Sequence, residues 1–307
     1  MAKVTPDYES SLEHLDSGQI NELEMHSFLN LVHVVYSQLE LLVEDNNKST
    51  YLVEAMRLTK HLASESRKGK VDIFFPKHIR EYKNVIRRTM HSLESHASDK
   101  AYLSEVREAR SLLEYIFSVL DVRVDELCER ISEPGEWKTF SVDDITDEFD
   151  AFFFTLEKNS NGRFRITQNI ALQEKSDYLI HFDVDSTGGD TIKMPLLLKD
   201  VIRDLVANAR KYTPPGGFIE AGVYQSAEKF RFVVTDNGIG IPEEELPHVF
   251  EYGYRASNAE HIRTMGGGFG LTKALHVVRQ LNGEMSIDST VGKGTRITIE
   301  LPLPAEA

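Results

Sequence analysis

The 307 residues are enough for two domains, each with its own hydrophobic core. A formal net charge of −14 argues against nucleic acid or an anionic membrane as the main partner, although a local phosphate site remains possible. The one cysteine, Cys128, excludes an intrachain disulfide, and the apolar runs are too short to span a bilayer. The acidic start does not resemble a secretory signal, so we expect a cytoplasmic protein.

The first part of the chain has apolar residues at alternating steps of three and four, which predicts helices. Four helices are expected, at 23–43, 50–65, 76–98 and 100–131. Pro76 suits the first turn of the third helix. The economical arrangement is two helical hairpins, at about 20–67 and 76–132, within a helical region placed at 1–135.

After Glu133-Pro134-Gly135 the pattern changes to strands mixed with helices. A strand and a short helix are expected within 140–154, helices at 196–211 and 270–282, and strands at 164–170, 178–184, 222–224, 230–235, 285–289 and 295–301. The predicted fold class is therefore α+β, with an all-helical N-terminal region followed by a mixed α/β domain at 139–307.

The first polar motif lies late in the helix at 196–211. Asp204 and Asn208 are one turn apart and therefore share a face. Carboxylate and amide oxygens can ligate Mg²⁺, whose shell is completed by phosphate and water. Lys211 lies within a turn of Asn208 and can reach a phosphate. Alone, such a pattern is more often a solvated helix face than a metal site.

The other polar motifs are rich in glycine. An apolar strand ends at Asp236, whose carboxylate can accept from the exocyclic amine of adenine, and Gly238 and Gly240 let the backbone approach a flat ligand. A plain Asp-Asn-Gly turn would explain that string about as often. Glycines at 266–268 and 270 precede a helix, whose N-terminal amides suit phosphate. Thr295, after a tight glycine turn, can back the adenine pocket.

In their order, these segments resemble the GHKL superfamily and, within it, the sensor histidine kinases. LVANARKYT resembles the N box, VTDNGIGIP the first glycine box, VFEYGYRAS the F box and GGGFGLTKAL the second glycine box. The resemblance implies an α/β sandwich that binds Mg-ATP under a lid at about 251–265. The expected ATP-site residues are Asp204, Asn208, Lys211, Tyr212, Asp236, Gly238, Gly240, Gly266, Gly268, Gly270, Leu271 and Thr295, with Asn208 and Asp204 on Mg²⁺ and Asp236 on adenine.

Asp204 departs from the family pattern. At this position the kinases usually have Asn, and the ATPase branches have a Glu that acts as general base. Aspartate is one methylene shorter than glutamate, so it can hold Mg²⁺ while placing an attacking water poorly. We therefore interpret Asp204 as a metal ligand rather than a base.

His26 is the strongest phosphoacceptor candidate in the helical region. His26 and Asn30 lie one turn apart beside the apolar seam, where an imidazole can attack the γ-phosphate and Asn30 can position a water or an aspartyl phosphate. Residues 20–65 resemble the H-box hairpin of the sporulation-phosphotransferase and citrate-sensor type. Ser27, however, stands where the kinases usually have an acid. His91 or His96, or no acceptor at all, are the alternatives.

The sequence thus indicates a two-component histidine kinase that phosphorylates itself with Mg-ATP and passes the group to a response-regulator receiver domain. By resemblance we expect a homodimer through the His26 hairpin, since two helices alone leave their seams exposed. Input would come from a separate sensor protein or the second hairpin, and no nucleic-acid or membrane partner is expected. The main alternative is a phosphotransferase, phosphatase or scaffold without autokinase activity; a serine/threonine kinase of the superfamily is less favoured.

Overall fold

A computed structural model of the chain describes residues 2–6, 15–43, 50–68, 75–97, 99–132, 136–158, 160, 162–262 and 268–304. The chain divides into two compact units. A helical unit consists of Leu15–Pro134, and an α/β unit combines Met1–His14 with Gly135–Ala307. This division confirms the predicted α+β fold class, with a helical part followed by a mixed α/β part.

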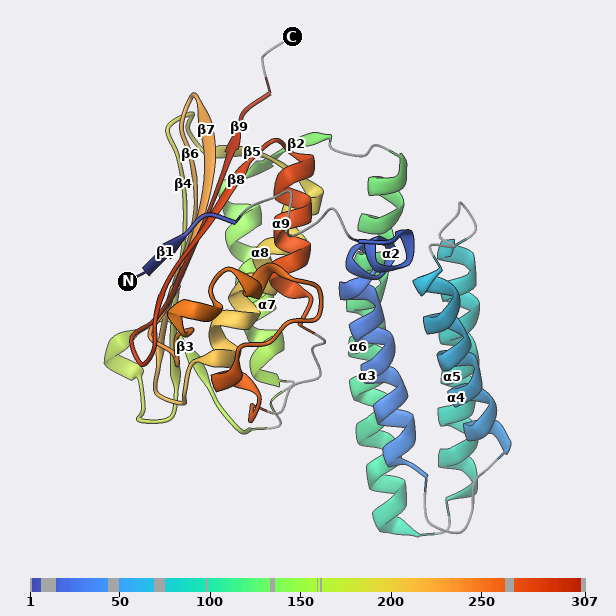
Figure 1. Cartoon of the computed structure of the whole chain (residues 1–307). Helices are drawn as coiled ribbons and strands as arrows, with labels where there is room; N and C mark the ends of the chain where they lie inside the picture. Colours follow the sequence, from blue (N-terminus) through green and yellow to red (C-terminus); the bar gives the residue numbers. More distant parts are fainter. Residues whose placement is uncertain are drawn as a thin grey trace. The chain divides into compact units, whose positions relative to one another are not determined.

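The described helices of the helical unit are α2 (Ser17–Glu24), α3 (His26–Leu41), α4 (Thr50–Arg67), α5 (Phe75–His96) and α6 (Lys100–Ser132). The helix α3 packs against α4 and α6, and α5 packs against α4 and α6, so the four long helices form a bundle (Figure 1). Their buried side chains make one continuous core. The α5–α6 hairpin therefore covers the apolar seam of the α3–α4 hairpin. None of these described helices is long and apolar enough to cross a membrane.

The first predicted helix, 23–43, is broken at Met25. The Asp16 carboxylate and the Gln19 side chain form a capping box at the start of α2, which ends at Glu24. The Met25 amide still donates to the carbonyl of Asn21, while the Met25 carbonyl already accepts from Leu29. His26 is consequently the first residue of α3, and does not lie inside a longer helix as predicted.

The α/β unit is built on a seven-stranded sheet in the described residues. The strand order is β1 (Ala2–Val4), β8 (Glu284–Thr290), β9 (Gly294–Pro302), β7 (Lys229–Asp236), β6 (Phe218–Gln225), β4 (Tyr178–Ser186) and β3 (Ile166–Thr167). The pairs β3–β4 and β4–β6 are parallel and the others antiparallel. A separate ribbon pairs β2 (Trp137–Ser141) with β5 (Thr191–Pro195).

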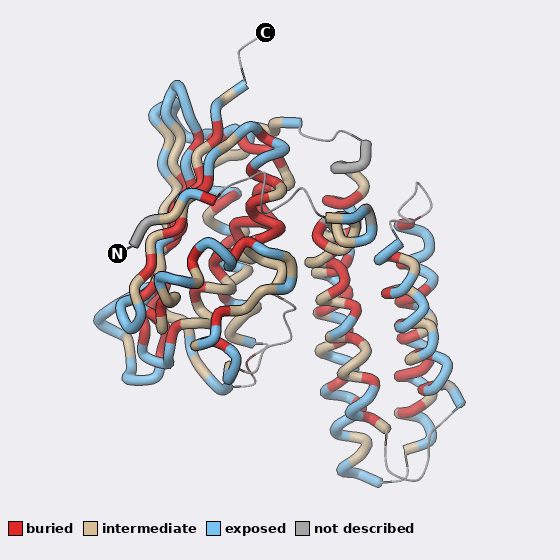
Figure 2. Tube along the Cα trace, in the orientation of Figure 1, coloured by how far each residue is buried: buried red, intermediate tan, exposed pale blue. Residues whose placement is uncertain are grey.

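Three helices cover one face of this sheet: α7 (Val142–Lys158), α8 (Leu196–Tyr212) and α9 (Gly270–Gln280) (Figure 1). The strands alternate accordingly, with Phe230, Phe232 and Val234 of β7 buried and Lys229 and Arg231 exposed. Buried positions run along the inner faces of both layers (Figure 2). This two-layer arrangement places the C-terminal end of α8 and the N-terminal end of α9 near the glycine-rich turns.

Two features of the α/β unit differ from expectation. Strand β1 pairs antiparallel with β8, with Ala2 opposite Ser289 and Val4 opposite Ile287, although the first residues were assigned to the helical region. A strand of three residues is too short for an alternation of apolar and polar side chains to be recognised in the sequence. The helix α7, expected to be short, extends over 17 residues because Ile145, Phe149 and Phe153 give it a continuous buried stripe.

Candidate nucleotide site and phosphoacceptor

Asp236 lies at the end of β7 and is 9% exposed. Its Oδ1 accepts from the amide of Gly238 at 2.8 Å and from the amide of Thr295 at 3.3 Å. Burial raises the pKa of Asp236 to about 6, against these two hydrogen bonds, which lower it. Both bonds fall on Oδ1, so Oδ2 is left to accept from a ligand such as the amine of adenine.

Glycines bring the backbone close around this carboxylate. Gly294 has a φ of +100°, and a Cβ there would lie 1.8 Å from the carbonyl oxygen of Asp236. Gly240 has a φ of +66°, and a Cβ would lie 2.0 Å from the carbonyl oxygen of Thr290. At Gly238 a Cβ would lie 2.4 Å from the carbonyl oxygen of Tyr212. The β7 turn, the β8–β9 turn and the end of α8 therefore meet at distances that only glycine permits.

The end of α8 is tied to this turn by main-chain and side-chain contacts. The Tyr212 carbonyl accepts from the Ile239 amide at 3.0 Å. The Thr295 hydroxyl lies 2.9 Å from the Ser289 hydroxyl, which in turn accepts from the Ile241 amide at 2.9 Å. The predicted pocket residues Tyr212 and Thr295 thus act on the shape of the turn through hydrogen bonds.

Asn208 on α8 faces the beginning of α9. A Cβ at Gly270, the first residue of α9, would lie 2.5 Å from the Asn208 side-chain nitrogen. Leu271 follows in the first turn, and Gly268 precedes it with a φ of +81°. The N–H groups of this first turn have no partner within the helix and carry its positive dipole end. The Asn208 amide therefore lies beside a helix N-terminus, the kind of helix end that suits phosphate.

Lys211 adds a positive charge beside Asn208. Burial, and then the nearby charges of Arg255 and Arg210, lower the pKa of the Lys211 ammonium to about 8. Its Nζ lies 4.9 Å from the centroid of the Tyr212 ring. Like charges held together in this way favour an anionic ligand, as expected for a phosphate site.

Arg255 belongs to the same region and was not among the predicted site residues. Its Nη2 donates to the carbonyls of Ala259 at 3.0 Å and Ile262 at 2.9 Å, which holds the segment after β7 in place. An arginine within the F-box-like segment was the signal available in the sequence. Nearby, the Asn258 amide donates to the Gly240 carbonyl at 2.8 Å, so this segment is joined to the first glycine turn.

Part of the predicted site lies outside the described residues. Gly266 is among them, and so is the end of the predicted lid at 263–265. The start of that lid is joined to α9, because the Thr272 hydroxyl donates to the Glu251 carbonyl at 3.0 Å. The lid itself stays a prediction.

Asp204 is one turn before Asn208 on α8, as expected, but it also has a cationic partner. The Nζ of Lys273 on α9 donates to Asp204 Oδ2 at 2.7 Å. Lys273 is 2% exposed and was not predicted as a site residue. A lysine three residues after Gly270 in the second glycine box was the only sequence signal for it.

The fit of Mg²⁺ to this site differs between its two predicted ligands. Asn208 has its amide group next to the N-terminal end of α9, and its oxygen would suit Mg²⁺ as a ligand. Asp204 already neutralises a buried ammonium. Across the described residues, no three His, Cys, Asp or Glu side chains are grouped to hold a metal.

In the helical unit, His26 lies at the N-terminal end of α3, half-buried beside the buried Phe28 and Leu29. Its Nε2 lies 3.1 Å from the side-chain nitrogen of Asn30. The Asn30 amide can donate to Nε2 in the tautomer of the imidazole that carries its proton on Nδ1. The pair predicted from the sequence is therefore in contact.

The alternative histidines have different surroundings. His91 and His96 are exposed on α5, and His96 Nδ1 lies 2.7 Å from the carbonyl oxygen of Ser92 in its own helix. His33, two turns after His26, is hydrogen-bonded through Nε2 to Arg67 at 3.2 Å. Of these four, only His26 pairs with an asparagine one turn along its helix.

A comparison with known protein families matches the part of the chain that contains the candidate nucleotide site. Residues 194–305 match the profile of the histidine kinase-, DNA gyrase B- and HSP90-like ATPases. The matched segment starts in β5 and ends after β9, so it contains every described residue of the candidate nucleotide site.

Individual relatives point the same way. The chain is 29% identical to the circadian input-output histidine kinase CikA of Synechococcus elongatus over 205 residues, which are 62% of this chain and 27% of CikA. It is 36% identical to the sensor histidine kinase WalK of Bacillus subtilis over 111 residues, 36% of this chain and 18% of WalK.

Among solved structures, the mycobacterial sensor histidine kinase MprB is 26% identical; the match covers 55% of this chain and 97% of that one, with a TM-score of 0.38. The chain spans about a quarter or less of the length of CikA and WalK. Residues 194–305 are therefore similar to the histidine kinase-, DNA gyrase B- and HSP90-like ATPases, and CikA and WalK, two of the relatives that the chain matches, are histidine kinases.

Proposed function

We propose that this protein is a Mg-ATP-dependent protein-histidine kinase that phosphorylates His26 and passes the phosphoryl group to an aspartate of a response-regulator receiver domain. The observation that supports it most is the buried Asp236 carboxylate, held by backbone amides among glycine turns, in a segment that matches the ATPase family. Such a pocket suits adenine, and the adjacent α9 N-terminus suits phosphate.

In this proposal each part of the α/β unit has a defined task. Asp236 accepts from the adenine amine, Lys211 neutralises phosphate charge, and the amides at the start of α9 hold the phosphate oxygens. Asn208 and Asp204 are the predicted metal ligands. When bound, Mg²⁺ supplies positive charge that stabilises the leaving diphosphate. The contribution of the protein is positioning and charge neutralisation.

The chemical step uses the neutral imidazole of His26. Its Nε2 lone pair, which faces Asn30, forms a bond to the γ-phosphorus of ATP, and the bond from that phosphorus to the bridging oxygen breaks. ADP leaves with the electron pair, and the ring proton is lost from Nδ1 to solvent water. The Asn30 amide must turn away from Nε2 for attack to occur, and it can then orient a water for the reverse, phosphatase reaction.

The test is incubation of the purified protein with γ-labelled Mg-ATP. We expect a label that is lost in acid and stable in base, as a phosphohistidine is, and that disappears in His26→Gln. The matched control is His33→Gln on the same helix, which should keep the label. A label that survives in His26→Gln would contradict the assignment of the acceptor, and an acid-stable label would indicate a serine or threonine kinase.

The second candidate is an ATP-binding phosphotransferase, phosphatase or scaffold of two-component signalling without autokinase activity. Ser27 favours it, because no acid follows His26 to take up the ring proton. This candidate predicts that ATP binds without labelling the protein. It also predicts that a phosphorylated receiver domain loses its label faster when the protein is added, and that this effect needs His26 or Asn30.

The predicted partners rest on the same proposal. A receiver domain would dock where it can reach His26, and a separate sensor protein would supply the input. The homodimer was expected because the seam of a two-helix hairpin would be exposed. The α5–α6 hairpin covers that seam within the chain, so a homodimer is now a prediction from resemblance alone, to be checked by light scattering.

A further inference from the structure

The buried lysine of α9, Lys273, contacts a residue that was predicted as a metal ligand. Lys273 is 2% exposed, and its Nζ lies 2.7 Å from Asp204 Oδ2 and 3.9 Å from Asp200 Oδ2. An ammonium taken out of water without a counter-charge is strongly unfavourable. The two aspartates lie one turn apart on α8, so both face the same point on α9. Lys273 therefore depends on carboxylates that α8 supplies.

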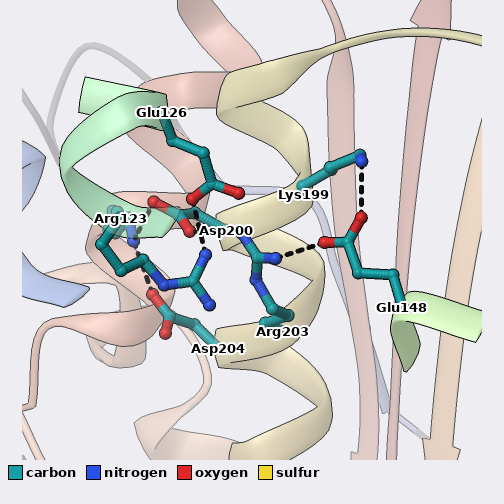
Figure 3. A network of polar contacts seen from close by, with 8 residues as sticks. Arg123, Glu126, Glu148, Lys199, Asp200, Arg203 and Asp204 are labelled. Atoms are coloured by element: carbon teal, nitrogen blue, oxygen red, sulfur yellow. Dashed lines mark hydrogen bonds and ion pairs between the residues drawn. The ribbon is translucent and has the colours of Figure 1, made fainter. Parts of the chain in front are cut away.

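Asp200 has a second cation to neutralise. Its Oδ1 accepts from Arg203 at 2.8 Å, and Arg203 also donates to Glu148 of α7 at 2.5 Å. Glu148 accepts from Lys199 as well, at 2.6 Å (Figure 3). Asp200 is thus shared, and at 3.9 Å it is the more distant partner of Lys273. Asp204 is the carboxylate in direct contact with the ammonium.

Ion pairs join charged side chains on α7, α8 and α9 into one cluster. Its cations are Lys199, Arg203 and Lys273, and its carboxylates are Glu148, Asp200 and Asp204. Removing the charge of Asp204 takes away the carboxylate that lies 2.7 Å from the Lys273 ammonium. A Mg²⁺ ion that took Asp204 as a ligand would compete with Lys273 for the same carboxylate and add two further positive charges.

The ion pair between Asp204 and Lys273 lies where it can influence how α8 and α9 are placed at the candidate nucleotide site. Lys273 is three residues after Gly270, and Asp204 is four residues before Asn208, so the ion pair lies one turn behind the contact between Asn208 and Gly270. The pair joins α8 to α9 and fixes how the phosphate-binding end of α9 faces Asn208. That contact is where a metal bridging to phosphate would bind.

We propose that Asp204 is the counter-ion of Lys273 and not a metal ligand, and that Lys273 is a positioning residue for the start of α9. Of the two predicted metal ligands, Asn208 would then be the one that holds Mg²⁺. The inference rests on the proposed function in so far as it concerns Mg-nucleotide binding. The pairing of Asp204 with Lys273 stands on the structure alone.

The first test is a double-mutant cycle on the full chain, read by urea unfolding. Asp204→Asn and Lys273→Met should each lower the unfolding midpoint of the α/β unit, because the first leaves the buried Lys273 ammonium without its nearest carboxylate and the second leaves the half-buried Asp204 carboxylate without its ammonium. The double variant should recover most of that loss. The control is Lys229→Met, which breaks the exposed 2.7 Å pair with Glu300 and should not shift the midpoint. Additive losses in the double variant would overturn the pairing.

The second test separates a counter-ion from a metal ligand. The affinity for ADP is measured with Mg²⁺ and with EDTA, and the ratio of the two dissociation constants is compared between variants. We expect the double variant Asp204→Asn, Lys273→Met to keep the wild-type ratio, and Asn208→Ala to bring the ratio close to one. A double variant that is stable but whose ratio falls to one would overturn the proposal.

The two tests also separate this inference from the proposed function. If the wild-type chain binds no adenine nucleotide under any condition, the proposed function fails, and the metal assignment fails with it. The unfolding cycle then still decides whether Asp204 and Lys273 are a coupled pair. If nucleotide binds and the cycle shows no coupling, the inference fails while the proposed function stands.

Discussion

The α/β unit and the helical unit hold their candidate functional groups in different ways. In the α/β unit, Asp236 is fixed by main-chain amides, and glycines bring the turns within contact. In the helical unit, His26 projects from the first turn of a helix and meets Asn30 on that same helix. A site fixed by backbone is sensitive to any change of the turn, whereas a group on a helix surface can be altered without changing the fold. Mutations should therefore separate binding from transfer.

The largest expected effect tests whether the two units are independent. Phe117→Ala on α6 removes a ring that is 2% exposed, and should destabilise the helical unit by about 3–5 kcal/mol. Val122→Ala, on the same helix and 52% exposed, is the control and should change stability little. ADP affinity, measured by calorimetry, should be the same in both variants. A loss of ADP affinity in Phe117→Ala would mean that the α/β unit needs the bundle core.

The next effect concerns the adenine contact. Asp236→Asn replaces an acceptor by a group that also donates, and should cost about 1.5–3 kcal/mol of binding free energy, roughly 10–100-fold in ADP affinity. Asp288→Asn makes the same change at a half-buried position on β8 and should leave affinity unchanged. Equal ADP affinity in Asp236→Asn and wild type would remove Asp236 from the adenine site.

The pH dependence of binding should report on the same pocket. The pKa of Asp236 is raised to about 6. Below that pH its carboxyl is protonated and no longer accepts as a charged carboxylate, so the affinity for ADP falls on the acid side. Above about pH 8 the lowered pKa of Lys211 leaves it neutral, so phosphate binding weakens on the alkaline side. Each limb should approach roughly tenfold per pH unit.

The two limbs can be assigned separately. Lys211→Met should flatten the alkaline limb of the ADP profile and leave the acid limb in place. Adenosine has no phosphate to titrate, so its affinity should show the acid limb alone. An alkaline limb that persists in Lys211→Met would assign it to another group.

The smallest expected effect concerns the residue after His26. Ser27→Asp supplies an acid next to the acceptor and should raise the rate of autophosphorylation by roughly tenfold, less than an aligned general base contributes. Ser27→Ala is the control and should leave the rate unchanged. A rate that does not rise in Ser27→Asp would mean that proton removal does not limit the transfer.

The sequence predicted different features of the two units, and the reasons for this difference are physical. The glycine motifs were weak one by one, but in their order they resemble the GHKL boxes, and this resemblance predicted Asp236, Asn208 and Gly270 to share one site. Apolar periodicity predicted the four long helices. It did not predict the break at Met25, because the buried spacing continues from Leu23 through Phe28. Lys273 was missed, since its role depends on a contact between two helices, with a partner, Asp204, that lies 69 residues away in sequence.

The covering of the α3–α4 seam by α5–α6 has a consequence for how the protein behaves on dilution. When all four helices come from one polypeptide, their association is intramolecular, and its equilibrium does not depend on protein concentration. The core that supports His26 would remain assembled even for a protein present in a few copies per cell. Each such bundle contains one copy of His26, so labelling should saturate at one phosphoryl group per four-helix core.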